Sequence, residues 1–240
     1  TRVLYAIGLT VPSSENDIQQ HLPHNRGARS VFFMDLVTKD PPKPEDGLIL
    51  EFLSQNVTVP EDWDTMYWCI TARLPHHLPK HHMIRYEPVI QPGNEPYVHH
   101  FILYSCQMDM SKWAGTQEAC FNKDMTKFSA MFQCSTKFIA GWAVGAEAHI
   151  YPDDVGFPMF ESDGDKFVML EVHYDNHALE KNIVDNSGIR LYLTTELRPK
   201  EAGAVTMGNL VGPMYQIIPP GMQYFTSYGI CSKECTKNFP

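Results

Sequence analysis

The stretch YVHHFILYSC, residues 97–106, places two adjacent histidines in a run of apolar, strand-forming residues that ends at a cysteine. Side chains alternate between the two faces of a β-strand, so at least one of His99 and His100 should face a core. An unpaired imidazole in a core costs free energy. The stretch therefore predicts a strand whose histidines have a partner that compensates their burial.

Similar apolar segments, separated by turns rich in Pro, Gly and Asn, predict strands on both sides of this stretch. They are TRVLYAIGL (1–9), ARSVFFMDLV (28–37), MYWCITARL (66–74), HMIRYEPVI (82–90), KFVMLEVHY (166–174), IRLYLTTEL (189–197) and MYQII (214–218). No long segment has the 3.6-residue period of a helix. The pattern predicts an all-β protein, a β-sandwich or jelly roll.

Composition limits the kinds of partner that the protein can bind and indicates its cellular compartment. The net charge is -9 and there is no extended basic run, which argues against a nucleic-acid or anionic-membrane partner. No apolar stretch approaches the ~20 residues of a transmembrane helix, and the absence of an initial Met suggests a processed or excised piece. The six cysteines lack CxxC spacing, which favours disulfides over zinc. With the glycosylation acceptor Asn56-Val57-Thr58, they predict a secretory-pathway protein.

The densest histidine cluster is HHLPKHH, which contains His76, His77, His81 and His82. Imidazole suits copper and zinc, so a metal site is one interpretation. Pro75 and Pro79 place the first pair in a turn beside Lys80, however, and we favour a solvated loop.

A second set of histidines lies in apolar strands. His99 and His100 share one predicted strand, and His173 lies in another, two residues after Glu171, which is a possible same-face partner. Cu(I) accepts a small number of imidazole ligands, and a β-bulge can turn two adjacent rings toward one metal. Three separately satisfied core histidines remain the alternative at this point.

Four segments together resemble the copper type II, ascorbate-dependent monooxygenases. They are VHHFILYSC (98–106), GWAVGAEAHIYPDDVGF (141–157), LEVHYDN (170–176) and DNSGIRLYLTTELRPKEAGAVTMG (185–208). The resemblance implies that His99, His100 and His173 hold an electron-transfer copper and that ascorbate is the reductant. A second copper of the family activates oxygen and hydroxylates the substrate, which is expected to be a small amine-like or peptide molecule.

The resemblance also implies two disulfides, Cys69 with Cys120 and Cys106 with Cys134, whereas Cys231 and Cys235 would lack their usual partners. Phe101 departs from the family pattern, which has methionine directly after the histidine pair. The second copper uses a His-x-His pair and a methionine, and no His-x-His occurs in these 240 residues. We therefore expect one copper site here, no residue of the oxygen-activating site, and no activity of the chain alone.

The resemblance suggests a division into four parts. Residues 1–37 would be the C-terminal remnant of a DOMON-like domain, with an added hairpin as the alternative, and the proline-rich 38–57 would be a linker. Residues 58–180 would form the first copper domain, and 181–240 the incomplete start of a second copper domain, also a β-sandwich. A secreted copper-binding or interaction module without catalysis is the alternative function.

Overall fold

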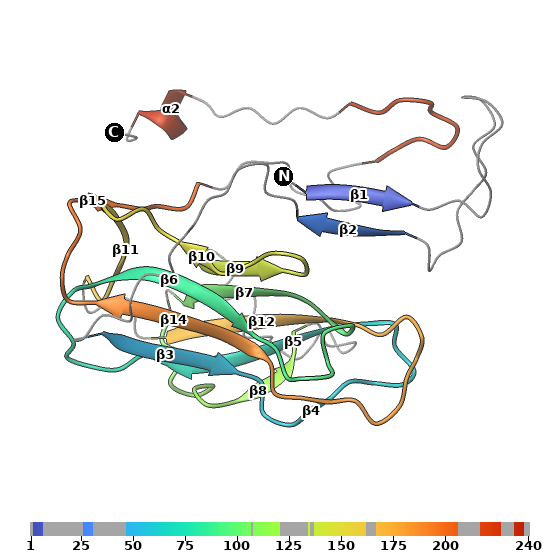
Figure 1. The fold of residues 1–240 in the computed structure, drawn as a ribbon, viewed down its shortest axis with the longest axis horizontal. Coiled ribbons are helices and arrows are strands. Elements are labelled where there is room, and N and C mark those ends of the chain that lie inside the picture. Colours follow the sequence, from blue (N-terminus) through green and yellow to red (C-terminus); the bar gives the residue numbers. More distant parts are fainter. Residues whose placement is uncertain are drawn as a thin grey trace. The chain divides into compact units, whose positions relative to one another are not determined.

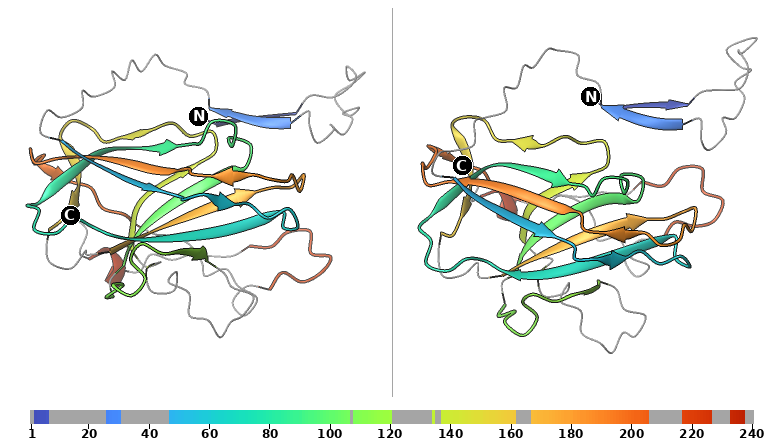
Figure 2. Two further views of the ribbon diagram at one scale, coloured as in Figure 1. Left: turned by 90° about the horizontal axis from the view of Figure 1, so that it is seen from below. Right: turned by 60° about the horizontal axis from the view of Figure 1, so that its bottom comes forward.

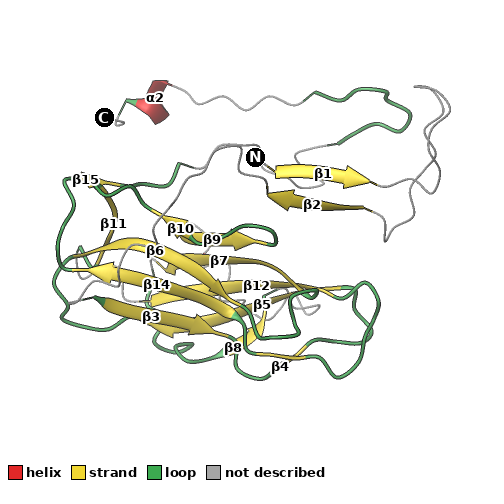
Figure 3. Ribbon diagram, in the orientation of Figure 1, coloured by secondary structure: helices red, strands yellow, loops and turns green. Residues whose placement is uncertain are grey.

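A computed structural model of the chain describes residues 2–6, 26–30, 47–106, 108–120, 134, 137–161, 167–205, 217–226 and 233–237. These residues are nearly all strand and loop, and the helix among them is the four-residue α2 (Lys233–Thr236) (Figure 3). The predicted all-β class is confirmed. No described helix has the length and apolar character needed to cross a membrane.

One layer is a five-stranded antiparallel sheet in the order β8-β5-β12-β7-β9 (Figure 1). Its strands are β5 (Thr65–Arg73), β7 (Val98–Cys106), β8 (Gln117–Ala119), β9 (Lys137–Ala143) and β12 (Phe167–Asp175). The central strand β12 pairs along its whole length with β5 and along most of it with β7. This sheet carries the histidines of the sequence motif.

The other layer is a six-stranded sheet in the order β15-β11-β6-β14-β3, with β10 paired to β6. Its strands are β3 (Leu48–Leu53), β6 (His81–Val89), β10 (His149–Ile150), β11 (Val155–Met159), β14 (Gly188–Thr194) and β15 (Lys200–Glu201). Two short pairs complete the described strands: β4 (Val57–Thr58) with β13 (Val184–Asp185), and β1 (Arg2–Ala6) with β2 (Arg26–Ser30).

A single apolar core lies between the two sheets. Figure 2 shows the sheets from two further directions. The residues that are at most 1% exposed in this core are Phe101, Leu103, Ala140, Val168, Leu170, Val172 and Tyr174 from the five-stranded sheet and Met83, Ile189, Leu191 and Leu193 from the six-stranded sheet. Because alternate residues of β12 and β7 fill the core, their other side chains, among them His100 and His173, line the opposite face of the sheet.

Five predicted strands agree with β5, β6, β7, β12 and β14 to within a few residues at each end. Strands β1 and β2 overlap the predicted segments 1–9 and 28–37, whose other residues lie outside the described ranges. The strand predicted at 214–218 is wrong where it can be judged, since Ile217 and Ile218 form no strand and are 71% and 62% exposed. Residues 214–216 lie outside the described ranges.

Two predicted boundaries do not match the sheets. Strand β3 and the first residue of β4 fall within the predicted linker 38–57, and β3 pairs with β14 over six positions. Strand β14 falls beyond 180, yet it lies between β6 and β3 inside the sandwich. The apolar side chains of β3 and β14 fill the same core, so both belong to the same sandwich. The compact unit containing it extends to Ala202, and a second unit begins at Gly203.

Candidate metal centre

A β-bulge brings the two adjacent histidines to one face of the five-stranded sheet. In the pairing of β12 with β7, His173 lies opposite His100 while the next residue, Tyr174, lies opposite Val98. His99 is therefore an extra residue on β7, and the alternation of side chains is interrupted there. The bulge explains how the imidazoles of His99 and His100, which are adjacent in β7, can both face His173.

The three imidazole rings converge through their Nδ1 atoms. The Nδ1 atoms of His99 and His100 are 3.2 Å apart, and that of His173 lies 3.2 Å from His99 and 3.3 Å from His100. A point equidistant from three such atoms is about 1.9 Å from each, close to the ~2.0 Å of a metal–imidazole bond. In the described part of the chain, this is the one group of three metal-ligating side chains found. The donor set fits a metal ion with few ligands, such as copper.

Contacts to the outer ring nitrogens fix two of the rings. His173 Nε2 lies 2.6 Å from Thr65 Oγ1, and His100 Nε2 lies 3.4 Å from Glu171 Oε1. An Nε2–H that donates to these oxygens leaves the Nδ1 lone pair free to face a metal. The Glu171 carboxylate, which can only accept, therefore favours at His100 the tautomer that metal binding requires, and the Thr65 hydroxyl can accept the corresponding proton of His173.

The phenol ring of Tyr67 supports the same arrangement. Tyr67 lies on β5 directly opposite His173, and the two rings stack with centroids 4.2 Å apart and planes inclined by 6°. The Tyr67 ring also meets the edge of His100 with centroids 6.0 Å apart. Stacking of this kind restricts the rotation of the His173 ring before a metal arrives.

The position of His173 also determines its charge. Burial, followed by the neighbouring rings of His100 and His99, lowers the pKa of His173 to about 4, against an ordinary value of 6.5. His173 is therefore neutral at neutral pH, which is the form that binds metal.

This lowered pKa predicts a pH-dependent stability of the metal-free chain. Between pH 6.5 and about 4, His173 is protonated in the unfolded chain but neutral in the folded chain, so the unfolded state binds more protons. The free energy of unfolding should fall as the pH is lowered through this window. His173→Gln, which keeps a hydrogen-bonding side chain but cannot be protonated, should show a smaller fall in urea denaturation at several pH values. Equal pH slopes for the two proteins would contradict the assignment.

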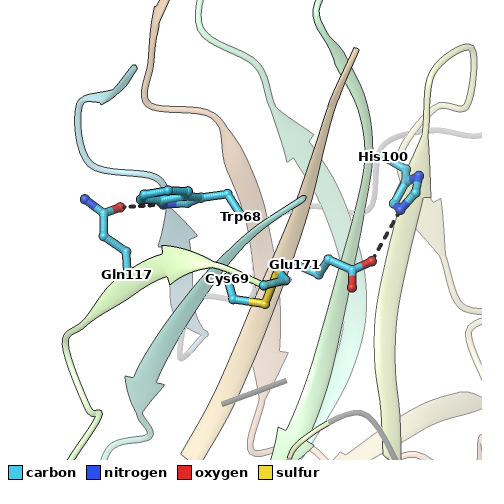
Figure 4. The surroundings of a disulfide bond; sticks show 6 residues. Trp68, Cys69, His100, Gln117 and Glu171 are labelled. Carbon is cyan, nitrogen blue, oxygen red and sulfur yellow. Dashed lines mark hydrogen bonds and ion pairs between the residues drawn. A yellow bond between two sulfur atoms is a disulfide. The ribbon is translucent and has the colours of Figure 1, made fainter. Parts of the chain in front are cut away.

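Both disulfides that the resemblance implies are formed, Cys69 with Cys120 and Cys106 with Cys134. The four sulfurs belong to a second apolar cluster on the histidine-bearing face of the five-stranded sheet. Cys69 lies opposite Glu171 in the pairing of β5 with β12, and Figure 4 shows this disulfide beside the Glu171–His100 contact. The bridges tie Cys120 and Cys134, which lie in the connection between β7 and β9, to β5 and β7 of the sheet that carries the three histidines.

The prediction of a solvated loop over residues 76–82 is correct only for its first half. His76 and His77 are exposed, but His81 and His82 lie in β6 and are only 4% and 1% exposed. Two backbone contacts compensate their burial: His81 Nδ1 lies 2.7 Å from Pro79 O, and the N–H of Arg198 donates to His82 Nδ1 at 2.9 Å.

Two further predictions concern the glycosylation acceptor Asn56 and the cysteines Cys231 and Cys235. Asn56 is exposed and lies between β3 and β4, where an acceptor side chain is accessible. Cys231 and the side chain of Cys235 lie outside the described residues.

Sequence reasoning missed Thr65 and Tyr67, because nothing in the sequence shows that β5 pairs with β12. It placed Glu171 on the face of His173, but the structure brings its carboxylate to His100 instead. The alternation of Tyr67 with the disulfide residue Cys69 is the signal that could have placed Tyr67 on this face.

Comparison with known proteins covers the part of the chain that contains these histidines. Residues 50–181 match the N-terminal domain of the copper type II ascorbate-dependent monooxygenases. The matched range contains all three converging histidines. It also contains β12 and β6, the central strands of the two sheets.

Individual relatives cover most of this chain. It is 36% identical to human "DBH-like monooxygenase protein 1" over an alignment of 219 residues that covers 88% of this chain and 34% of the relative. It is 34% identical to dog "Dopamine beta-hydroxylase" over 82% of this chain and 31% of the relative. Mouse "DBH-like monooxygenase protein 2" is 34% identical over 97% of this chain and 36% of the relative. The chain thus spans about a third of the length of these curated relatives.

The family match extends over more than half of the chain and includes the strands that carry His99, His100 and His173. The chain therefore belongs to the copper type II ascorbate-dependent monooxygenases.

Proposed function

We propose that His99, His100 and His173 hold one copper ion and that this chain carries the electron-transfer half of a copper- and ascorbate-dependent monooxygenase. The complete protein would hydroxylate a small amine-like or peptide substrate, using a second copper that the family pattern places elsewhere. The observation that carries the proposal is the convergence of three Nδ1 atoms at 3.2–3.3 Å from one another. Three imidazole nitrogens at this separation are placed to share one metal ion as ligands.

When bound, copper would supply storage of a single electron. The residues of the chain supply a site that need not change shape when the charge of the ion changes. The bulge at His99 fixes the backbone, and Thr65 and Glu171 hold the outer nitrogens of two rings. The stacked Tyr67 holds the plane of His173. A preorganised set of neutral imidazoles keeps the reorganisation on electron transfer small.

The proposal includes a location in the secretory pathway. Disulfides persist in oxidising compartments, and both bridges lie on the face of the sheet that carries the proposed copper site. The exposed Asn56 would be available as a glycosylation acceptor.

Copper titration followed by ascorbate tests the proposed function. We expect the purified chain to bind one Cu(II) tightly, to show its electron paramagnetic resonance signal with nitrogen coupling, and to lose that signal when anaerobic ascorbate is added. His76→Ala, which removes an exposed histidine outside the site, should behave like the wild type. Bound Cu(II) that ascorbate leaves oxidised would favour the alternative, a copper-binding module without a redox role.

A further inference from the structure

Glu171 is a buried carboxylate beside the proposed copper site, and its environment is unusual. It is 3% exposed and lies on β12 between Cys69 of β5 and Ile102 of β7. Its Oε1 is 3.4 Å from His100 Nε2, while its Oε2 is buried without a hydrogen-bond partner in the described structure. Figure 4 shows the carboxylate directed toward His100.

A carboxylate in such a position needs a compensating positive charge. Burial of an ionised group is costly unless it is paired, and an oxygen without a donor adds to the cost. Among the described ion pairs, the one that includes Glu171 is formed with His100, and an imidazole that ligates a metal through Nδ1 carries no charge of its own. A cation held by His100 would supply the missing charge one imidazole ring away.

We propose that Glu171 is the counter-ion and the positioning residue of this copper site, an inference that rests on the proposed function. Its Oε1 holds the Nε2 proton of His100, which directs the Nδ1 lone pair at the metal. Its negative charge attracts Cu(II) more strongly than Cu(I), because the interaction scales with the charge of the ion. The carboxylate therefore favours the oxidised state and lowers the reduction potential, which makes the reduced site a better electron donor.

Glu171→Gln separates the two roles, because the amide oxygen can still accept the proton of His100 Nε2 but carries no charge. Competition titrations with chelators should show that both affinities fall, that of Cu(II) more than that of Cu(I), so that the ratio of Cu(II) to Cu(I) affinity is about tenfold lower than in the wild type. For one electron, that ratio corresponds to a reduction potential higher by about 59 mV. Glu171→Ala, which also removes the hydrogen-bond acceptor, should weaken the binding of both oxidation states, on the order of tenfold or more.

Glu118→Gln is the matched control. Glu118 lies on β8 opposite Cys69, on the same face of the sheet as Glu171 but exposed, so water screens its charge. Its substitution should leave the potential unchanged. Urea denaturation of the metal-free proteins should show that Glu171→Gln is at least as stable as the wild type, since the cost of burying the charge is removed.

The outcomes distinguish this inference from the function on which it rests. Tight copper binding by the wild type with an unchanged ratio of Cu(II) to Cu(I) affinity in Glu171→Gln would overturn the counter-ion role and leave the copper site standing. An equal shift in Glu118→Gln would overturn it as well. A wild-type chain that binds no copper would overturn both proposals.

Discussion

Replacement of His173 by alanine should weaken copper binding on the order of a hundredfold to a thousandfold, because it removes one of three ligands from a site with few ligands. The loss should be larger than for any contact around the ligands, since Thr65 and Tyr67 act only by orienting this ring. Competition with a chelator of known affinity measures the change. The electron paramagnetic resonance spectrum of any residual Cu(II) should show fewer coupled nitrogens.

The same experiment has a control within the chain. The exposed His76 contacts Arg73 and lies outside the group of converging histidines, so His76→Ala should bind copper as the wild type does. Because the side chain of His173 lies on the outer face of the sheet, its removal should leave the inter-sheet core intact, and the circular dichroism spectrum should be unchanged. Undiminished copper binding by His173→Ala, or anomalous scattering from metal at residues 76–82, would contradict the assignment.

The sequence predicts the central strands well because the same residues both favour a β-strand and are apolar enough to be buried. Strand β7 covers 98–106 as predicted, since its apolar residues are both strand-forming and buried. Strand β3 was missed because the prolines and charges at 38–47 suggest a linker that continues into it. Strand β9, with Gly141 near its centre, lacks an uninterrupted apolar run, and the pattern of strand-forming residues does not predict it.

The local sequence pattern alone does not determine where the histidine side chains lie in the fold. Simple alternation sends His99 and His100 to opposite faces, and only the pairing of β7 with β12 reveals the bulge that reverses this. The partner strand of His173 is likewise a property of the sheet order. His81 and His82 were assigned to a loop because their polar partners, Pro79 O and the Arg198 N–H, are supplied by the backbone, one of them from a distant segment.

Replacement of Asp185 by alanine should lower the free energy of unfolding by about 3–5 kcal/mol, because each buried donor that is left without an acceptor costs about 1–3 kcal/mol. Asp185 is 0% exposed, and its carboxylate accepts four hydrogen bonds. The donors are Asn94 Nδ2 at 2.6 Å, Ser187 Oγ at 2.6 Å, Tyr174 OH at 2.8 Å and Ser187 N at 2.8 Å. Removal of the carboxylate leaves these donors in an apolar interior without acceptors.

Urea denaturation of the metal-free protein measures this loss, and Asp153→Ala is the control because Asp153 is exposed, so its substitution should change stability by no more than about 0.5 kcal/mol. A comparable loss for both variants would mean that the hydrogen bonds of Asp185 stabilise the fold no more than an exposed carboxylate does.

The hydrogen bonds of Asp185 also have a consequence for the proposed metal site. Tyr174, which donates to Asp185 and contacts Ser54 at 2.9 Å, directly follows His173 at the bulge. Where Asp185→Ala still folds, its copper affinity should therefore fall as well, because the anchored Tyr174 holds the strand at the point where the three imidazoles meet.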